Sequence, residues 1–249
     1  MRDRLENEKA FHNESFSQGV RKSIDEYYTI FRQIRKDFSD RIIAFVPNKN
    51  VIECGCGVST FSPEFAPLAN SLLGIDISDE AVRQSKEKAD NAGLTNCEFK
   101  VMNAEDLKVE DNSVSLIFGS GIIHHLDLDV FYKEAERVLD SKGKIIFMEP
   151  LGHNPFINFY RWITPKMRTP DEHPLLRKDL KQIAKHFKVV NIKYYYFFSM
   201  AAIPFRRTRI FGGMLNTLDA VDQFFFSCIP YFKYMAWYVL IDASNPKSK

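Results

Sequence analysis

The chain has 249 residues, of which 45% are hydrophobic and 27% charged, and this composition predicts one globular domain with a sizeable core. A net charge of +2 gives no reason to expect a nucleic-acid-binding protein. The cysteines have no zinc-type spacing, and the charged first residues lack the apolar core of a signal peptide. We therefore expect a cytoplasmic protein with reduced thiols and no metal site.

The first 48 residues predict a helical cap. Their apolar residues recur at three- and four-residue steps, which places them on one side of a helix. The residues of this stripe are Phe16, Val20, Ile24, Tyr27, Tyr28, Phe31, Ile34 and Phe38.

Between residues 49 and 150, short apolar strands alternate with helices. We expect strands at 50–54, 71–76, 96–101, 114–119 and 143–149. We expect helices near 58–68, 78–92 and 129–140. This alternation predicts an α/β fold in which a mostly parallel sheet is covered by helices on both faces.

The second half is irregular from 150 to 174, then predicts a helix near 177–186 and a strand near 188–197. Aromatic residues gather between Tyr194 and Tyr238, but Pro230 and Lys233 interrupt any membrane span. We expect a helix packed on the sheet and a closing strand at 237–242. An apolar substrate wall or a peripheral membrane contact is the alternative for the aromatic segment.

A glycine-rich turn is the strongest functional signal. The apolar strand at 50–54 runs into Gly55 and Gly57, and Asp76 follows Gly57 by nineteen residues at the end of the next strand. This layout is typical of a nucleoside site, because glycines admit the ligand to the backbone and the carboxylate accepts hydrogen bonds from ribose. Thr60 stands where a dinucleotide-binding turn has its third glycine, which disfavours a nicotinamide enzyme.

Four motifs in the same order resemble those of the class I S-adenosylmethionine (SAM)-dependent methyltransferases. They are Glu53-Cys54-Gly55-Cys56-Gly57, Gly74-Ile75-Asp76-Ile77-Ser78, Asn103-Ala104-Glu105-Asp106-Leu107, and 113–118 running into 121–126. The resemblance implies a Rossmann-like, doubly wound, mostly parallel seven-stranded sheet in a single domain, with SAM as cofactor.

The resemblance also implies a division of the chain and a role for its parts. Residues 1–48 would form the helical cap, 49–150 the SAM-binding core, 151–236 a substrate-side insertion and lid, and 237–242 the closing strand.

In such an enzyme, Gly55 and Gly57 would let the backbone pass under the methionine part of SAM, with Glu53 anchoring the turn. Asp76 would hold both ribose hydroxyls, because a carboxylate offers two acceptor oxygens to a diol. Ile77 would pack on the adenine ring.

Four further residues complete the cofactor site that the resemblance implies. Asn103 stands where many family members have aspartate, and its side-chain carbonyl would accept a hydrogen bond from the adenine amine. Ala104 would offer its backbone amide to adenine, and Ser120 would lie near the methionine amino group. Tyr28 would cover the cofactor and touch its carboxylate, or else pack in the core.

Histidines are the candidates for a catalytic base, since an unperturbed pKa near 6.5 suits proton removal at neutral pH. His124, His125 and His153 follow the fourth and fifth strands, at the sheet edge where ligands bind, and His173 lies further on. By the family pattern His124 faces the site and His125 is structural, so His124 and His153 are the predicted catalytic residues. Hydrogen-bonded support of the loops is the alternative role.

The long connection that follows allows two interpretations. Residues 169–174 read as a helix start, with Thr169 as N-cap, but Asp171, Glu172 and His173 could also meet a polar substrate. Together with 149–155, this segment resembles a bacterial subgroup of small-molecule methyltransferases associated with glycan or natural-product biosynthesis.

We therefore expect methyl transfer to oxygen or nitrogen of a small molecule, by a monomer or homodimer. Two alternatives stay open. One is an enzyme that cyclises the aminobutyrate arm of SAM and releases methylthioadenosine, and the other is a non-catalytic SAM-binding subunit.

Overall fold

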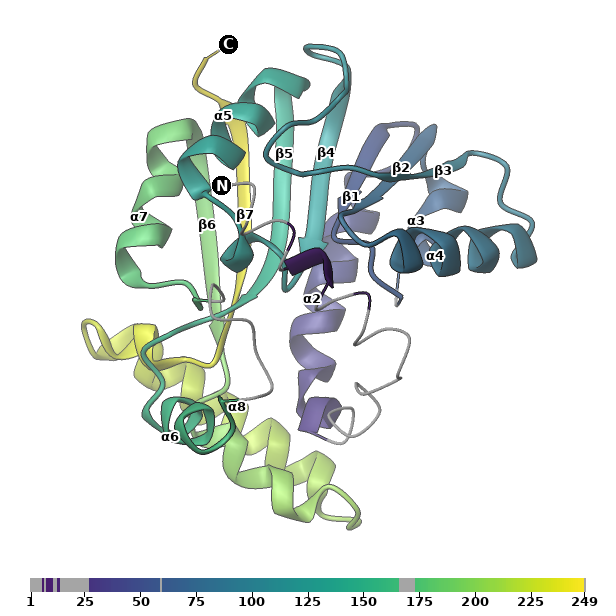
Figure 1. Ribbon diagram of the computed structural model, residues 1–249. Helices are drawn as coiled ribbons and strands as arrows, with labels where there is room; N and C mark the ends of the chain where they lie inside the picture. Colours follow the sequence, from purple (N-terminus) through teal and green to yellow (C-terminus); the bar gives the residue numbers. More distant parts are fainter. Residues whose placement is uncertain are drawn as a thin grey trace.

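A computed structural model of the chain (Figure 1) describes residues 6, 8–10, 13, 27–58, 60–165 and 173–248. Its centre is a seven-stranded sheet with the order β3-β2-β1-β4-β5-β7-β6. The strands are β1 (Asn50–Cys54), β2 (Ser71–Asp76), β3 (Cys97–Val101), β4 (Val114–Ser120), β5 (Leu139–Pro150), β6 (Phe187–Tyr195) and β7 (Tyr238–Pro246). Only β7 runs antiparallel to its neighbours in this sheet. The predicted fold class, a mostly parallel Rossmann-like sheet, is confirmed.

Helices cover both faces of the sheet, as predicted (Figure 1). The α-helices are α2 (Arg32–Ile43), α3 (Ser62–Phe65), α4 (Asp79–Asn91), α5 (Leu128–Val138), α6 (Pro155–Ile163), α7 (Arg177–His186) and α8 (Phe211–Cys228). The 3-10 helices are η2 (Tyr27–Phe31), η3 (Ala66–Leu68), η4 (Ile123–His125), η6 (Phe198–Phe205) and η7 (Phe232–Met235).

Side chains of β4 show how the two faces are built. Leu116 and Phe118 pack with Phe38 of α2 in one hydrophobic core, whereas Ile117 packs with Phe131 of α5 in the other. All five are fully buried. Because successive strand residues point to opposite faces, a strand buried on both sides reads as the continuous apolar run seen in this sequence.

Several predicted boundaries were wrong. The helix expected at 58–68 begins at Ser62, because residues 58 and 60 belong to the irregular turn that leaves the glycines. The helix expected at 129–140 ends at Val138, and β5 begins at Leu139, before the predicted 143. The strand expected at 188–197 ends at Tyr195, where Tyr196 turns the chain with φ of 67°. The closing strand continues past 242 to Pro246.

The region 151–236 is more regular than predicted. It includes α6, which begins at the Asn154–Pro155 start signal and was not predicted, and also α7 and β6, which were. The helix start predicted at Thr169 falls on residues outside the described part. His173 and Pro174 are not helical, and α7 begins at Arg177, with the Asp179 carboxylate accepting the Leu176 amide.

The N-terminal stripe is confirmed where it is described. Phe31, Ile34 and Phe38 are buried on the sheet face covered by α2. Phe16, Val20 and Ile24 lie outside the described residues, as do the side chains of Tyr27 and Tyr28, so the predicted role of Tyr28 stays a prediction. None of the described helices has both the length and the apolar character needed to cross a membrane.

Candidate active site

The glycine turn follows β1 at the carboxyl edge of the sheet. Gly55 and Gly57 have φ values of 64° and 51°, in the left-handed region that favours glycine. A Cβ on Gly55 would lie 3.0 Å from Cβ of Ile122, so the turn also runs close to the chain beyond β4. The Cys56 amide donates to the carbonyl of Ile75, which ties the turn to β2. The turn therefore presents main-chain atoms, rather than side chains, at the carboxyl edge of the sheet.

Glu53, at the end of β1, holds the segment that follows this turn. Its buried carboxylate accepts hydrogen bonds from the Thr60 hydroxyl at 2.6 Å, the Phe61 amide at 2.8 Å and the Ser62 hydroxyl at 3.0 Å. Burial nevertheless raises the pKa of Glu53 to about 7. These contacts hold residues 60–62 rather than the glycines, so anchoring of the turn by Glu53 stays a prediction.

Asp76 ends β2 directly beside the turn. One carboxylate oxygen accepts the Gly57 amide at 3.0 Å and the other accepts the Ser78 amide at 2.9 Å. Each oxygen retains further acceptor capacity, because a carboxylate has about four lone-pair positions. Ser78 then caps α4 by accepting the Ala81 amide at 3.1 Å. Ile77 lies between Asp76 and this cap, at the same edge.

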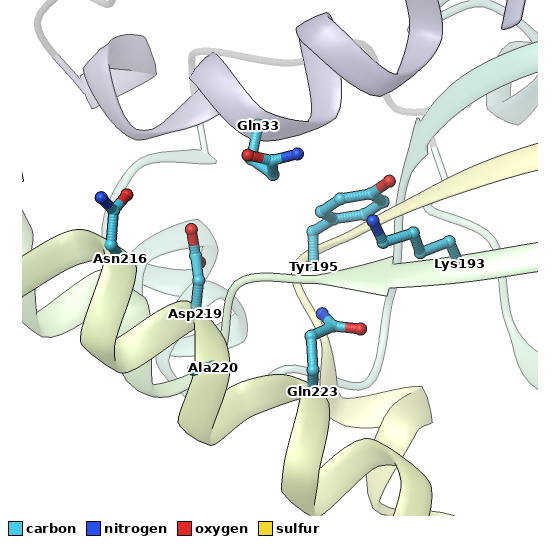
Figure 2. A pocket seen from close by; sticks show the side chains of 7 residues that line it. All are labelled: Gln33, Lys193, Tyr195, Asn216, Asp219, Ala220 and Gln223. Carbon is cyan, nitrogen blue, oxygen red and sulfur yellow. The ribbon is translucent and has the colours of Figure 1, made fainter.

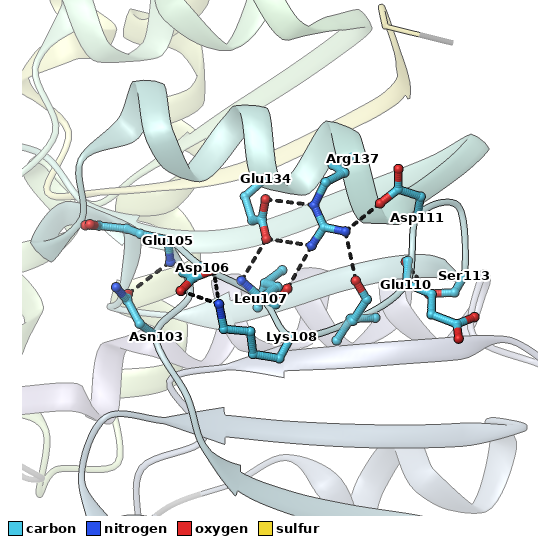
Figure 3. Close-up of polar contacts among 11 residues, drawn as sticks. Asn103, Glu105, Asp106, Leu107, Lys108, Glu110, Asp111, Ser113, Glu134 and Arg137 are labelled. Carbon is cyan, nitrogen blue, oxygen red and sulfur yellow. Dashed lines mark hydrogen bonds and ion pairs between the residues drawn. The ribbon is translucent and has the colours of Figure 1, made fainter.

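The loop after β3 carries Asn103 and Ala104, and Figure 3 shows how it is fixed. The Asn103 side-chain oxygen accepts the Glu105 amide at 3.0 Å. Further along, Glu134 of α5 accepts the Leu107 amide at 2.8 Å, and Arg137 donates to the Leu107 carbonyl at 2.7 Å and to the carboxylate of Glu134. Ala104 itself is buried. Helix α5 thus holds this loop in one position.

The buried pair His124 and Glu149 was only half anticipated. Nδ1 of His124 in η4 lies 2.7 Å from Oε2 of Glu149 in β5, and both side chains are buried. The other oxygen of Glu149 accepts the amides of Ile122 and Ile123 at 2.9 and 3.1 Å. Since a carboxylate accepts, Nδ1 carries a proton, and in the neutral ring Nε2 carries the lone pair. Sequence reasoning named His124 but missed Glu149, although Glu149 ends a strand at this edge.

The neighbours of this pair are Ser120 and His125. Ser120 is half-buried at the last position of β4, and Gly121 after it turns with φ of 65°. His125 lies against the N-terminal segment, with its Nδ1 3.4 Å from Oε2 of Glu8. Lys9 of the same segment pairs with Asp79 at 2.7 Å. Part of the N-terminal segment therefore covers this edge.

The other two candidate histidines, His153 and His173, do not form a buried pair with a carboxylate as His124 does. Nε2 of the exposed His153 accepts the backbone amide of Arg177 at 3.3 Å, at the start of α7. That contact uses the nitrogen lone pair that a base needs, and it is the loop support named as the alternative role. His173 is exposed in the connection before α7.

A cleft lies at the far edge of the sheet, between α2 and α8 (Figure 2). Its volume is about 430 Å³. It is lined by Gln33, Lys193, Tyr195, Asn216, Asp219, Ala220 and Gln223. Strands β4, β5 and β7 separate β6 from β1, so this cleft is distinct from the glycine turn. Burial raises the pKa of Asp219, on its wall, to about 6.

The described residues contain no group of histidine, cysteine and carboxylate side chains able to hold a metal ion. Cys54 and Cys56 are buried free thiols in the turn, and burial raises their pKa values well above the ordinary range. These thiols therefore stay protonated and contribute packing rather than charge.

Comparisons with known proteins agree with this geometry. The family described as "Methyltransferase domain" matches residues 45–193, more than half of the chain. Phosphoethanolamine N-methyltransferase 1 of Caenorhabditis elegans is 36% identical over 93 residues, covering 35% of this chain and 19% of that protein. The ubiquinone/menaquinone biosynthesis C-methyltransferase UbiE of Rickettsia bellii is 29% identical over 156 residues, covering 57% of this chain and 63% of that protein.

Among solved structures, phosphoethanolamine N-methyltransferase 2 of Haemonchus contortus, in complex with phosphomonomethylethanolamine and S-adenosylhomocysteine, has a similar fold. Its TM-score is 0.65 at 15% identity, covering 94% of this chain and 59% of that one. This chain spans less than two thirds of the length of each of these three proteins. The family match, the seven-stranded sheet and the glycine turn with its paired acid agree. The chain belongs to the class I SAM-dependent methyltransferases.

Proposed function

We propose that this protein transfers a methyl group from SAM to an oxygen or nitrogen atom of a small molecule, such as a glycan or natural-product intermediate. His124 would remove the proton that such an acceptor must lose. The observation that carries the proposal is the buried His124–Glu149 pair, at the same sheet edge as the glycine turn.

The cofactor contacts in this proposal come from the residues at that edge. Gly55 and Gly57 expose backbone, Asp76 has acceptor capacity beyond its two amide contacts, and Asn103 and Ala104 sit on a loop fixed by α5. Ile77, Ser120 and Tyr28 are the remaining proposed contacts. Bound SAM would supply an electrophilic methyl group on its sulfonium.

The pair is suited to proton removal for two reasons. The Glu149 carboxylate fixes the orientation and the tautomer of the His124 ring, so the basic nitrogen Nε2 is held in one orientation. It also places a negative charge beside the imidazolium that forms when His124 takes a proton, which stabilises that charged state. Glu149 is itself positioned by the Ile122 and Ile123 amides. His153 is the other candidate, and its Nε2 accepts the backbone amide of Arg177.

By their names, the related proteins methylate phosphoethanolamine at nitrogen or act as C-methyltransferases in ubiquinone and menaquinone biosynthesis. We assign neither acceptor to this chain. Deprotonation is required for a hydroxyl or an ammonium acceptor, and the His124–Glu149 pair supplies a base for either.

The test is incubation with labelled SAM and a panel of hydroxyl- and amine-bearing small molecules. The proposal predicts S-adenosylhomocysteine and a methylated product only when an acceptor is present. Methylthioadenosine released from SAM alone would overturn it in favour of cyclisation of the aminobutyrate arm. SAM binding without turnover on any acceptor of the panel would favour the non-catalytic subunit instead.

A further inference from the structure

Most of the large apolar side chains of helix α6 are exposed to solvent. Phe156, Phe159, Trp162 and Ile163 are all more than half exposed, and Trp162 reaches 76%. Ile157 is the one buried residue of this helix. An ordinary surface helix turns its apolar stripe to the core. The stripe of α6 faces solvent, although this helix follows directly from the β5 edge that carries Glu149.

The exposed apolar surface continues onto the C-terminal elements. Asn154, the N-cap of α6, donates to the carbonyl of Met235 at 2.9 Å, and the Phe156 ring lies 5.7 Å from that of Phe197. Figure 1 shows both α6 and α8 beyond the carboxyl edge of the sheet. On and after α8, Phe224 and Tyr231 are also mostly exposed. We call the exposed side chains of this region the apolar surface: Phe156, Phe159, Trp162, Ile163, Phe224, Ile229 and Tyr231.

The described segments that carry the apolar surface have more basic than acidic residues. The described segments 151–165 and 198–235 carry five basic residues, Arg161, Arg206, Arg207, Arg209 and Lys233. Their only acidic residues are Asp219 and Asp222. Asp222 is fully buried, where it accepts the amides of residues 197–199, and Asp219 is turned into the cleft of Figure 2.

Aromatic rings and cations meet at the rim of this surface. The Arg177 guanidinium lies 4.4 Å from the ring centroid of exposed Tyr231 and 5.4 Å from that of Tyr234. Lys233 lies 5.5 Å from the ring centroid of Tyr194. Side chains with an apolar body and a charged or polar tip suit the boundary between hydrocarbon and water.

We propose that the apolar surface docks the protein on an anionic phospholipid membrane. The aromatic and aliphatic side chains of α6 would enter the boundary between headgroups and acyl chains, and the basic residues would meet the lipid phosphates. Charge complementarity selects this occupant over a neutral apolar partner. Because α6 begins five residues after Pro150, docking would hold the carboxyl edge of the sheet toward the bilayer. The proposal does not depend on the methyl-transfer reaction.

The test is flotation of the purified chain with vesicles of phosphatidylcholine alone or mixed with phosphatidylglycerol. We expect binding to the mixed vesicles, weakened by salt, with a blue shift of Trp162 fluorescence. Phe159→Asp with Trp162→Asp should lower binding at least tenfold, and so should Arg207→Glu with Arg209→Glu, since each basic residue near an anionic surface contributes about a fivefold factor.

The matched controls lie at the opposite, amino edge of the sheet. Ile43→Asp replaces an exposed apolar residue at the end of α2, and Lys142→Glu reverses an exposed charge near the start of β5. Both should bind vesicles like the unaltered chain. Thermal melting and SAM binding should be unchanged in every variant, because all altered side chains are solvent-exposed.

Two outcomes would overturn the proposal. Absence of binding to the mixed vesicles is one. The other is a dimeric mass in sedimentation for the unaltered chain and a monomeric mass for the Phe159→Asp, Trp162→Asp variant, with neither form binding vesicles. That result would make the surface an interface between two copies.

Discussion

Nδ1 of His124 and Oε2 of Glu149 are 2.7 Å apart in a position from which solvent is almost excluded. Glu149 comes from β5 and His124 from the 3-10 helix after β4, two adjacent parallel strands. The carboxylate is shared between this ring and two backbone amides, so the loop and the ring are fixed by one group.

Replacement of the ring tests its role as base. His124→Ala should lower turnover by a factor on the order of 10²–10⁴, the usual contribution of general-base catalysis, while SAM affinity changes little. Turnover with a saturating acceptor and calorimetry with SAM check the two quantities. His186→Ala, which removes the histidine paired with Glu136 at the end of α7, is the matched control. Near-normal turnover of the His124 variant would remove it from the role.

Glu149→Gln separates positioning from proton transfer. Loss of the negative charge beside His124 should lower the pKa of the imidazole, because the charged ring loses its partner. The acid limb of the pH–rate profile should therefore move to lower pH, and the maximal rate should fall. A variant with a reduced rate and an unmoved acid limb would show that Glu149 acts only through folding of the loop.

Asp76→Ala should weaken SAM binding by about 1.5–3 kcal/mol, the typical free energy of hydrogen bonds to a charged group. The Gly57 amide, which donates to this carboxylate, would also lose its partner. Isothermal calorimetry measures the change. Asp90→Ala, an exposed carboxylate at the end of α4, should leave the affinity unaltered. Equal affinities in the two variants would refute the ribose assignment.

Glu53 should make the stability of the cofactor-free protein depend on pH. Burial raises its pKa from 4.5 to about 7, so the folded state holds this proton more tightly than the unfolded chain does. The free energy of unfolding should then fall as pH rises through this interval and level off above it. Glu53→Gln should flatten that slope in urea unfolding at a series of pH values.

Asp219 contributes a slope of the same sign over a lower pH interval, since its pKa is raised from 3.8 to about 6. Asp219→Asn is therefore the control that divides the two contributions. If the Glu53→Gln slope equals that of the unaltered chain, the raised pKa of Glu53 is wrong.

Asp222 joins α8 to η6. Its buried carboxylate accepts the amides of Phe197, Phe198 and Ser199 and the Ser199 hydroxyl. Asp222→Asn would turn one acceptor into a donor facing other donors, so unfolding should cost about 3 kcal/mol less. Urea denaturation checks this value, with Asp90→Asn, an exposed carboxylate at the end of α4, as the comparison. A change below that of the control would contradict this anchoring role.

The first half of the fold could be predicted well because its signals are local. Strands β1 and β2 were placed to the residue, since apolar runs bounded by turn residues leave little choice. The helix cap at Ser78 and the glycine turn are likewise specified by residues that are close together in the sequence. The proposed cofactor site is based on these features.

The remainder depends on contacts that no short window contains. Glu149 meets His124 across 25 positions of sequence, and Asp222 meets Phe197 across 25. Helix α6 was not predicted, although Asn154 caps it and Pro155 stands in its first turn, and both are local signals of a helix start. Strand β5 begins early because pairing with β4 extends it to Leu139, an effect of the neighbouring strand rather than of its own residues.

The position of β7 has a consequence for the order of folding. This strand lies between β5 and β6 and pairs with both, whereas β6 has no other neighbour in the sheet. During synthesis, β1 to β5 can pair as they emerge, but β6 must wait for residues 238–246 before it gains a partner. The edge of the sheet at β6 therefore forms by pairing of strands that are far apart in sequence, and such long-range pairing is slow in folding. A chain lacking β7 would be expected to keep a parallel five-stranded core with β5 as an open edge.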